Sequence, residues 1–421
     1  MADVRKRGFR ERSDVETVLA SLAAVPGLGP EEVDLARCAG RVLAEDVRAE
    51  VDVPHFARAV MDGYALRGGD TFGATALNML ELTVSGESLP GQPFPGRVKE
   101  GCAVRITTGA PLPEGADAVL PFEDCDERAT SVLVLAPVAP HKNVGACGED
   151  VRKGEELLLR GRRLRPQDVG LLASIGRGRI ACVRRPEVEV IVTGSELLPP
   201  GSRPRGSRIV DSNSVVLTAL VARDGGAALP TRHLPDTENA LSAGLLQSRA
   251  DVTLCVGGTS VGHDDLLPEL LTRHGQLDFH GVNLRPASPA GGGRIGPRRV
   301  FLLPGNPVSC LCAYEFFAGP TIRALGGRPR DWPHRRVRAR LARKIVSTVG
   351  RTDYVRVRLE GERVEPIATS GASILSSTVR ATGAVIVPRQ LEGMAAGEEV
   401  EVLLYDEHPE PASLRAAAEG S

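Results

Sequence analysis

The fold is decided by the stretch Val188-Glu189-Val190-Ile191-Val192-Thr193-Gly194-Ser195-Glu196. It opens with a short, mainly apolar run, which suits a strand buried on both faces, and its glycine indicates a tight loop. Similar runs lie at Val252–Val256 and Val300–Leu303. Helical patterns alternate with these runs, at Val215–Arg223, Thr237–Arg249, Leu266–Arg273 and Val308–Leu325. Alternating strands and helices predict a parallel, three-layer α/β domain with right-handed crossovers.

The sequence on either side of this region predicts further domains. Ser13-Asp14-Val15-Glu16 is a capping-box pattern that predicts an N-terminal helix, and a second helix is expected over Glu31–Arg37. Residues 49–140 are rich in glycine, proline and short apolar runs, which favours a β-rich module. A later helix near Pro166–Ile175 would pack with the N-terminal helices as one interrupted domain. Short alternating runs at 335–405 predict a small all-β domain, either a barrel or a sandwich.

Composition limits the classes of function. The 52 basic residues nearly balance the 53 acidic ones, and the net charge of -1 gives no general reason to expect nucleic acid or a membrane surface as partner. Met1–Arg12 is charged and has no apolar core of the signal-peptide kind, and no stretch of about 20 apolar residues is present. The 8 cysteines include no Cys-x-x-Cys pair, which disfavours a zinc site. We therefore expect a cytoplasmic protein.

The loops that follow the predicted strands are the candidate ligand-binding elements, because ligands of open α/β sheets bind beyond the carboxyl ends of the strands. Gly257-Gly258-Thr259-Ser260-Val261-Gly262 offers backbone N–H groups and hydroxyls ahead of a helix, which suits a phosphate or another oxyanion. Pro304-Gly305-Asn306-Pro307-Val308-Ser309 predicts a rigid turn onto a helix. Neither loop matches the phosphate-loop or dinucleotide-binding motif. Tight turns that need glycine explain each loop equally well when it is taken alone.

Carboxylates stand beside these loops. Glu196 follows the first strand, and Asp264 and Asp265 follow the second. They would repel an anionic ligand unless a bridging Mg²⁺ accepted oxygen ligands from both sides. Capping of the next helix is the alternative role for Asp264 or Asp265, and it applies equally to Asp211 and Asp236.

Further motifs accompany these loops in a fixed order along nearly the whole chain. They are Met61-Asp62-Gly63-Tyr64-Ala65, Arg105-Ile106-Thr107-Thr108-Gly109-Ala110-Pro111, Gly115-Ala116-Asp117-Ala118-Val119 and Gly148-Glu149-Asp150, followed by the two loops at 257–262 and 304–309. In this order they resemble the molybdopterin molybdenumtransferase family, of the MoeA and gephyrin E-domain type.

The resemblance implies a multidomain α/β and β protein. Its expected domains are a split elongated domain at 10–48 and 141–184, an inserted β-rich domain at 49–140, an α/β molybdopterin-binding domain at 185–327 and a C-terminal β-barrel domain at 328–410. It implies a homodimer, with each active site between the α/β domain of one subunit and the inserted domain of the other. The implied reaction inserts molybdate into adenylylated molybdopterin, with Mg²⁺ as cofactor and release of AMP, in molybdenum cofactor biosynthesis.

The resemblance also implies roles for individual residues. Catalytic roles fall to Asp62, Asp150, Glu196 and Asp265, with Asp62 and Asp150 supplied by the partner subunit. The implied metal ligands are Glu196, Asp265 and Asp264. Pro304 and Pro307 would shape the molybdate pocket. The full set implied to bind substrate is Thr108, Thr193, Asp236, Gly257, Gly258, Ser260, Arg285, Ser288, Pro304, Asn306, Pro307, Arg351 and Ser376.

The chain departs from the family pattern at basic positions. The usual Lys-Pro-Gly-Lys-Pro segment reads Arg285-Pro286-Ala287-Ser288-Pro289, and an upstream lysine position holds Gly281. Each lost charge-assisted contact costs about 1.5–3 kcal/mol. Arg285, Arg294, Arg298 and Arg351 are candidates to supply the missing charge, although a planar guanidinium is not equivalent to an ammonium.

Three functions remain as hypotheses from the sequence. The first is an active molybdenumtransferase. The second is a divergent, non-catalytic paralogue that binds a pterin or scaffolds cofactor assembly, which the missing lysines favour. The third is a nucleotide-cleaving enzyme of the CinA type that shares only the α/β domain. The N-terminal motifs argue against the third, because that family places its related domain first.

Overall fold

The computed structural model describes residues 12–258, 266–368 and 371–405. Their contacts define two compact units, one of Glu32–Cys182 and one that joins the residues up to Glu31 to those from Val183 onward. Ser260, Asp264 and Asp265, which were predicted as site residues, lie outside the described residues. The domain boundaries expected from the sequence stay a prediction. Within the described ranges, no helix is both long and apolar enough to cross a membrane.

The α/β domain is built on a sheet whose central strands are parallel, as predicted. Its strands are β13 (Glu187–Thr193), β16 (Ala227–Ala228), β17 (Arg232–Leu234), β18 (Val252–Val256), β19 (Gln276–His280), β21 (Gly291–Ile295) and β22 (Arg298–Leu303). Their order is β16-β13-β18-β22-β21-β19, and β17 also pairs with β13. The strands from β16 to β22 run parallel, whereas β21 and β19 add an antiparallel edge.

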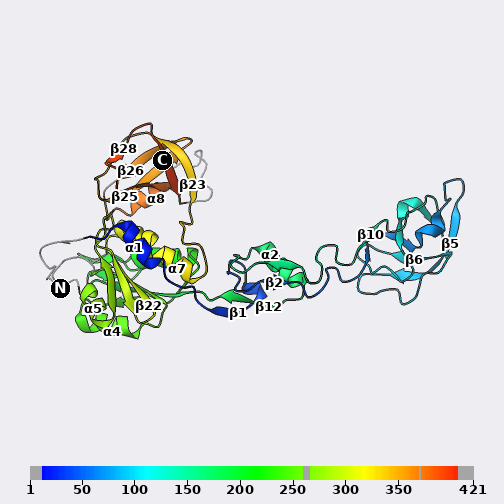
Figure 1. Cartoon of the computed structure of the whole chain (residues 1–421), viewed down its shortest axis with the longest axis horizontal. Coiled ribbons are helices and arrows are strands. Elements are labelled where there is room, and N and C mark those ends of the chain that lie inside the picture. Colours follow the sequence, from blue (N-terminus) through cyan, green and yellow to red (C-terminus); the bar gives the residue numbers. More distant parts are fainter. Residues whose placement is uncertain (1–11, 259–265, 369–370, 406–421) are drawn as a thin grey trace. The chain divides into compact units, whose positions relative to one another are not determined.

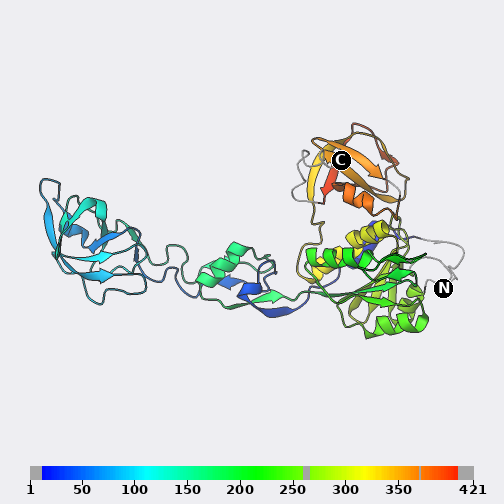
Figure 2. The same cartoon turned by 180° about the vertical axis from the view of Figure 1, so that it is seen from behind.

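Helices cover both faces of this sheet (Figure 1 and Figure 2). They are α3 (Asn213–Arg223), α4 (Glu238–Gln247), α5 (Leu267–His274), α6 (Pro307–Ala313) and α7 (Gly319–Leu325), with the π-helix η4 (Tyr314–Ala318) between the last two. Alternate strand residues enter two different cores: Leu254 packs in the core with α3, α6 and α7, and Cys255 in the core with α4 and α5. The predicted three-layer arrangement is therefore confirmed. Glu189 is a polar residue within the first run. A carboxylate is tolerated in this buried strand because it pairs with Arg232 at 2.8 Å.

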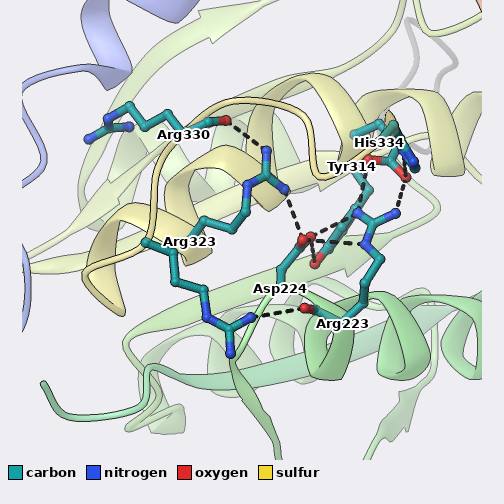
Figure 3. A network of polar contacts seen from close by, with 8 residues as sticks. Arg223, Asp224, Tyr314, Arg323, Arg330 and His334 are labelled. Atoms are coloured by element: carbon teal, nitrogen blue, oxygen red, sulfur yellow. Dashed lines mark hydrogen bonds and ion pairs between the residues drawn. The ribbon is translucent and has the colours of Figure 1, made fainter. Parts of the chain in front are cut away.

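A buried polar network ties α3 to the helices that follow β22 (Figure 3). The side chain of Asp224 is 0% exposed. It accepts hydrogen bonds from the hydroxyl of Tyr314 and from a guanidinium nitrogen of Arg323, each at 2.9 Å. Arg223 donates to Asp224 at 2.9 Å and to Glu315 at 2.6 Å. Because a buried carboxylate is tolerated only when it is paired, these contacts fix the helices relative to one another.

The C-terminal domain is a closed β-barrel. Its ring consists of β23 (Arg335–Leu341), β25 (Thr352–Glu360), β26 (Arg363–Ala368), β27 (Gly383–Val387) and β29 (Glu399–Leu404). Neighbours pair in the order β25-β26-β23-β29-β27, and β27 pairs back with β25, which closes the ring. Smaller elements accompany it, namely β20 (Leu284–Arg285), β24 (Ile345–Val346), α8 (Ser376–Arg380) and β28 (Gly393–Met394). Of the two predicted alternatives, the barrel is therefore correct.

The predicted N-terminal helix is α1 (Val15–Leu22), but it begins differently from the prediction. Its apolar residues pack in the core of the α/β domain with α3, α6 and α7. No capping box forms, because Asp14 makes no side-chain cap. The Asp14 carboxylate instead accepts a hydrogen bond from Asn283 at 2.9 Å and pairs with Arg389. Contacts made later in the chain therefore replace the local cap.

The unit Glu32–Cys182 holds several separate apolar cores. One core contains elements from both ends of the unit: β1 (Pro30–Asp34), η1 (Leu35–Arg37), β2 (Val47–Arg48), β11 (Glu156–Leu158), α2 (Pro166–Ser174) and β12 (Arg179–Val183). The β-rich module is a six-stranded sheet of β4 (Gly63–Leu66), β5 (Leu80–Ser88), β6 (Cys102–Ile106), β7 (Ala118–Pro121), β8 (Cys125–Glu127) and β9 (Ser131–Val134). Short elements complete it: β3 (Arg58–Ala59), η2 (Gly68–Thr71), η3 (Phe122–Asp124) and β10 (Val144–Gly145).

The helix predicted over Glu31–Arg37 is wrong. Pro30–Asp34 is strand β1 beside β12, and only a single 3-10 turn follows it. The backbone N–H of Leu35 then donates to the carbonyl oxygen of Gly178 at 2.9 Å. Pairing with a distant strand supplies backbone hydrogen bonds that outweigh the weak local preference for helix.

Candidate functional site

A cavity of about 940 Å³ opens beyond the carboxyl ends of β13, β18 and β22. This volume lies near the upper end of the range for sites that bind small molecules and cofactors. All three predicted loops contribute to it. The lining residues are Thr193, Gly194, Ser195, Glu196, Leu197, Ile209, Val210, Asp211, Ser212, Asn213, Asp236, Val256, Gly257, Gly258, Leu266, Pro289, Pro304, Gly305, Asn306, Pro307 and Ser373.

The loop after β13 is held by Asp236. One carboxylate oxygen of Asp236 accepts the hydroxyl of Thr193, and the other accepts the backbone N–H of Ser195 at 3.0 Å. Asp236 therefore holds the loop that carries Glu196, rather than capping α4, whose start has no side-chain cap. Glu196 is exposed on the cavity wall. Its carboxylate makes no hydrogen bond or ion pair with another described residue.

The described part of the loop after β18 needs glycine. Gly257 and Gly258 have φ values of 92° and 58°, in the left-handed region that glycine adopts without strain. A Cβ on Gly257 would lie 2.5 Å from the carbonyl oxygen of Thr193. The missing side chain thus lets the loops after β13 and β18 meet and leaves their backbone open to a ligand.

The turn at Pro304–Pro307 is fixed from two sides. The side-chain amide of Asn213 donates to the carbonyl oxygen of Gly305 at 2.8 Å. The hydroxyl of Ser373 donates to the side-chain oxygen of Asn306 at 2.8 Å, so a loop of the barrel domain reaches the cavity. The sequence did not single out Asn213 or Ser373 as site residues. Asn213 lies two residues after Asp211, and that predicted helix cap was the nearest signal in the sequence.

Asp211 combines the capping role that the sequence suggested with a second contact. One oxygen of its carboxylate accepts the backbone N–H of Ser214 at 3.1 Å, in the first turn of α3. The other oxygen lies 2.9 Å from a ring nitrogen of His233 on β17. The Asp211 side chain is 1% exposed, and the contacts with Ser214 and His233 supply hydrogen-bond partners for both oxygens of this buried carboxylate.

The cavity is acidic in the part that the structure describes. Glu196, Asp211 and Asp236 line it, and none of the described lining residues is a lysine or arginine. An anionic ligand therefore needs positive charge from another source. Among the described residues, no group of three or more histidine, cysteine, aspartate or glutamate side chains is arranged to hold a metal ion.

The arginines expected to supply charge are engaged elsewhere. Arg285 and Arg351 both pair with Asp353, whose side chain is 1% exposed, with Arg351 at 2.8 Å. Arg298 donates to the carbonyl oxygens of Ser248 and Leu245 at the end of α4. Neither Arg285 nor Arg351 lines the cavity.

Three other expected residues also stand away from the cavity lining. Ser288 and Ser376 do not line it, and the hydroxyl of Ser288 is buried without a partner among the described residues. Arg294 donates to the neutral side chain of Gln276 at 2.7 Å. The roles that the resemblance implied for these residues stay predictions.

In the unit Glu32–Cys182, two of the predicted residues meet. The carboxylate of Asp62 accepts the backbone N–H of Thr108 at 2.7 Å and its hydroxyl at 2.8 Å. These two hydrogen bonds hold the pKa of Asp62 below its ordinary value. The side chains of Asp62, Thr108 and Asp150 are exposed. They are therefore open to contact by a ligand or another chain.

Family models match the chain along most of its length. They are the MoeA N-terminal region (domain I and II) at residues 13–176, a probable molybdopterin binding domain at 189–324, and the MoeA C-terminal region (domain IV) at 338–405. The chain belongs to the MoeA family. The match to the N-terminal region leaves the CinA-type hypothesis without support, since that hypothesis required only the α/β domain to be shared.

Relatives of the MoeA family share about a third of the residues. A putative molybdopterin biosynthesis protein of Methanocaldococcus jannaschii is 34% identical, over 89% of this chain and 92% of that protein. The molybdopterin molybdenumtransferase of Haemophilus influenzae is 32% identical, over 88% and 93%. Two crystal structures of the MoeA protein of Pyrococcus horikoshii are 33% identical, with TM-scores of 0.81 and 0.74, and each match covers 94% of this chain and 100% of the other.

Proposed function

We propose that the chain is a molybdopterin molybdenumtransferase that inserts molybdate into adenylylated molybdopterin and releases AMP. One observation carries the proposal: in a member of the MoeA family, three loops meet in a cavity beyond the carboxyl ends of β13, β18 and β22. Pterin, phosphoanhydride and adenosine together need a large site, and the volume of this cavity is compatible with such a ligand. We also propose a cytoplasmic location and the four domains with the boundaries given above, except that α1 belongs with the α/β domain into whose core it packs.

Glu196 is the described residue that fits a Mg²⁺ ion. Mg²⁺ usually takes one or two protein carboxylates and completes its shell with water and substrate phosphate. The Glu196 carboxylate is exposed in the cavity and has no partner among the described residues, which leaves its oxygens available. Mg²⁺ would draw charge from the phosphoanhydride of the substrate when bound. Asp265 and Asp264, the other proposed ligands, lie outside the described residues.

The remaining roles follow from the geometry of the loops. Asp236 holds Thr193 and the backbone of Ser195, and so positions Glu196. Gly257 and Gly258 let a phosphate approach their backbone. Asn306, with Pro304 and Pro307, would form the molybdate end of the cavity, and its orientation is set by Ser373.

We further propose that the enzyme is a homodimer. Asp62, Thr108 and Asp150 would then complete the site of the partner subunit. The exposed Asp62–Thr108 pair supports this proposal, because a carboxylate whose pKa is lowered remains charged and keeps a free oxygen for a ligand.

The test is turnover. Purified protein is incubated with adenylylated molybdopterin, molybdate and Mg²⁺, and AMP and active cofactor are measured beside an active family member. We expect both products, and we expect Glu196→Gln to lower kcat/KM about a hundredfold or more. Glu401→Gln, on a barrel residue paired with Arg336 at 3.3 Å, is the matched control and should leave kcat/KM unchanged.

A second function is favoured by the absence of cationic side chains from the described cavity lining and by the pairing of Arg285 and Arg351 with Asp353. It is a non-catalytic paralogue that binds a pterin or scaffolds cofactor assembly. Pterin binding by calorimetry with no AMP release would establish it and would contradict the transferase.

A further inference from the structure

A strongly basic loop adjoins the acidic cavity. Residues 199–208, here called the basic loop, have the sequence Pro-Pro-Gly-Ser-Arg-Pro-Arg-Gly-Ser-Arg and connect β14 (Leu197–Leu198) to β15 (Ile209–Val210). Arg203, Arg205 and Arg208 are all exposed. The whole chain is almost neutral, with a net charge of -1, so three arginines within six residues concentrate positive charge at one place.

The base of the basic loop is part of the cavity wall. Strands β14 and β15 are parallel, and Leu197, Ile209 and Val210 all line the cavity. The backbone N–H of Ile209 donates to the carbonyl oxygen of Glu196 at 2.9 Å, so the loop is attached directly to the proposed metal ligand. The guanidinium of Arg208 donates to the carbonyl oxygen of Leu197 at 3.3 Å, which places its charge beside the lining.

The charges of the basic loop are not neutralised within the described part of the chain. Arg203, Arg205 and Arg208 form no ion pair with a described carboxylate. Other arginines of the same domain do: Arg184 pairs with Asp251 at 2.7 Å, and Arg273 with Glu269 at 3.0 Å. The basic loop therefore retains its positive charge next to a cavity whose described lining has none.

This arrangement meets the electrostatic need of an anionic ligand. A phosphoanhydride or oxyanion that enters beside Glu196, Asp211 and Asp236 is repelled by three carboxylates. Unpaired guanidinium groups act over a Debye length of about 8–10 Å and bind phosphate oxygens in a bidentate manner. The basic loop thus offers the charge that Arg285 and Arg351, held by Asp353, do not bring to the cavity.

We propose that Arg203, Arg205 and Arg208 form an anion subsite at the mouth of the cavity, which binds the phosphate portion of the ligand. The subsite deepens the proposed transferase function and rests on it. The arginines act on binding rather than on the chemical step, because they are exposed and none of them lines the cavity.

The experiment compares three triple variants of the full-length protein with wild type. R203Q/R205Q/R208Q removes the charge, and R203K/R205K/R208K keeps it. R336Q/R338Q/R340Q is the matched control, since it removes the same charge from β23, which does not line the cavity. We expect the first variant to raise KM for adenylylated molybdopterin about tenfold with kcat unchanged, as three exposed charge contacts of modest strength would give together.

The lysine variant should restore KM to within about threefold of wild type, and the β23 variant should leave it unchanged. Raising salt from about 0.05 to about 0.2 M should raise the KM of wild type more than the KM of R203Q/R205Q/R208Q, because salt screens charges that the variant has lost. Equal KM values and equal salt dependence in wild type and R203Q/R205Q/R208Q would overturn the subsite.

A binding measurement separates failure of the subsite from failure of the proposed function. Calorimetry with AMP as the probe needs no turnover, and R203Q/R205Q/R208Q should raise its Kd about tenfold. If wild type releases no AMP in the turnover assay but this shift in Kd is found, the transferase function fails and the subsite stands. If wild type turns over and neither KM nor Kd changes in the variant, the subsite fails alone.

Discussion

The arginines around Asp224 and the arginines of the basic loop differ in how their charge is used, although both belong to the α/β domain. Arg323 has a side chain that is 4% exposed, and its guanidinium contacts the buried carboxylate of Asp224 at 2.9 Å (Figure 3). Arg203 and Arg205 are exposed and have no described acidic partner. Paired charge holds helices of this domain together, and unpaired charge remains available to a ligand. The difference therefore separates effects on stability from effects on binding.

The largest expected effect comes from breaking the buried network. Asp224→Asn keeps the shape of the side chain but leaves the buried guanidinium of Arg323 without a carboxylate partner and Arg223 with Glu315 alone. We expect the free energy of unfolding to fall by about 3–5 kcal/mol, because the remaining charges stay buried. Fluorescence of Trp332, the single tryptophan, reports on this unit, since its ring lies 5.0 Å from that of Phe316.

The control for this variant is the surface pair of Glu401 and Arg336, whose side chains are 54% and 51% exposed. Glu401→Gln should change the free energy of unfolding by no more than about 1 kcal/mol. If Asp224→Asn and Glu401→Gln lowered the free energy of unfolding by the same small amount, the network of Figure 3 would not be what fixes these helices.

Acid should weaken the same network through Glu315. Burial raises the pKa of Glu315, but contacts with His334 and Arg223 lower it by more, to about 2 from the ordinary 4.5. A lowered folded-state pKa stabilises the protein above the unfolded pKa and stops doing so as the pH falls through the folded value. We therefore expect a loss on the order of 3 kcal/mol as the pH drops from about 4.5 to about 2.

The comparison for this titration is Glu315→Gln, which removes the titrating group. Unfolding is followed at each pH by the fluorescence of Trp332, whose ring lies 5.9 Å from that of His334. The stability difference between wild type and the variant should shrink toward low pH. Parallel curves would show that Glu315 is not the group that takes up the proton.

The sequence alone predicted the α/β domain well because the patterns that indicate its strands, turns and helices each lie within a short segment of the chain. Runs such as Val252–Val256 and the glycines at 257 and 258 carry the signal within a few residues, and alternation with helices determines the sheet. The strand at Pro30–Asp34 was missed because its partner, β12, lies about 150 residues away, and the residues near Pro30–Asp34 carry no strand pattern of their own.

The same reason limits what the sequence revealed about charge in the site. Glu196 and Asp236, which line the cavity, could be selected from the sequence because they lie directly beside predicted strands and helices. The pairing of Arg285 with Asp353 joins residues 68 positions apart, so the sequence could not show that this arginine is already engaged. Asp211 was predicted as a cap, but its contact with His233 depends on the placement of β17 beside β13.

Arg285 is intermediate between the buried arginines around Asp224 and the exposed arginines of the basic loop. Its side chain is 29% exposed, yet it pairs with a buried carboxylate. Arg285→Gln should lower the free energy of unfolding by about 1.5–3 kcal/mol, the usual loss for a hydrogen bond to a charged group. Arg294→Gln, which breaks solvent-exposed hydrogen bonds to Gln276, is the matched comparison and should cost no more than about 1 kcal/mol. A large rise in KM with unchanged stability would instead support the substrate-binding role that the family resemblance implied.

The smallest effect is expected from single changes in the basic loop, and it tests how the subsite is arranged. Arg208 contacts the carbonyl oxygen of Leu197 on the cavity wall, whereas Arg203 has no such contact among the described residues. Arg208→Gln should therefore raise KM by about two- to fivefold and Arg203→Gln by less, both without a change in thermal stability. Equal effects would indicate that the loop attracts the ligand through its total charge, whereas a larger effect at Arg208 would indicate direct contact. In both cases KM changes while stability does not, whereas changing the arginines around Asp224 should alter stability.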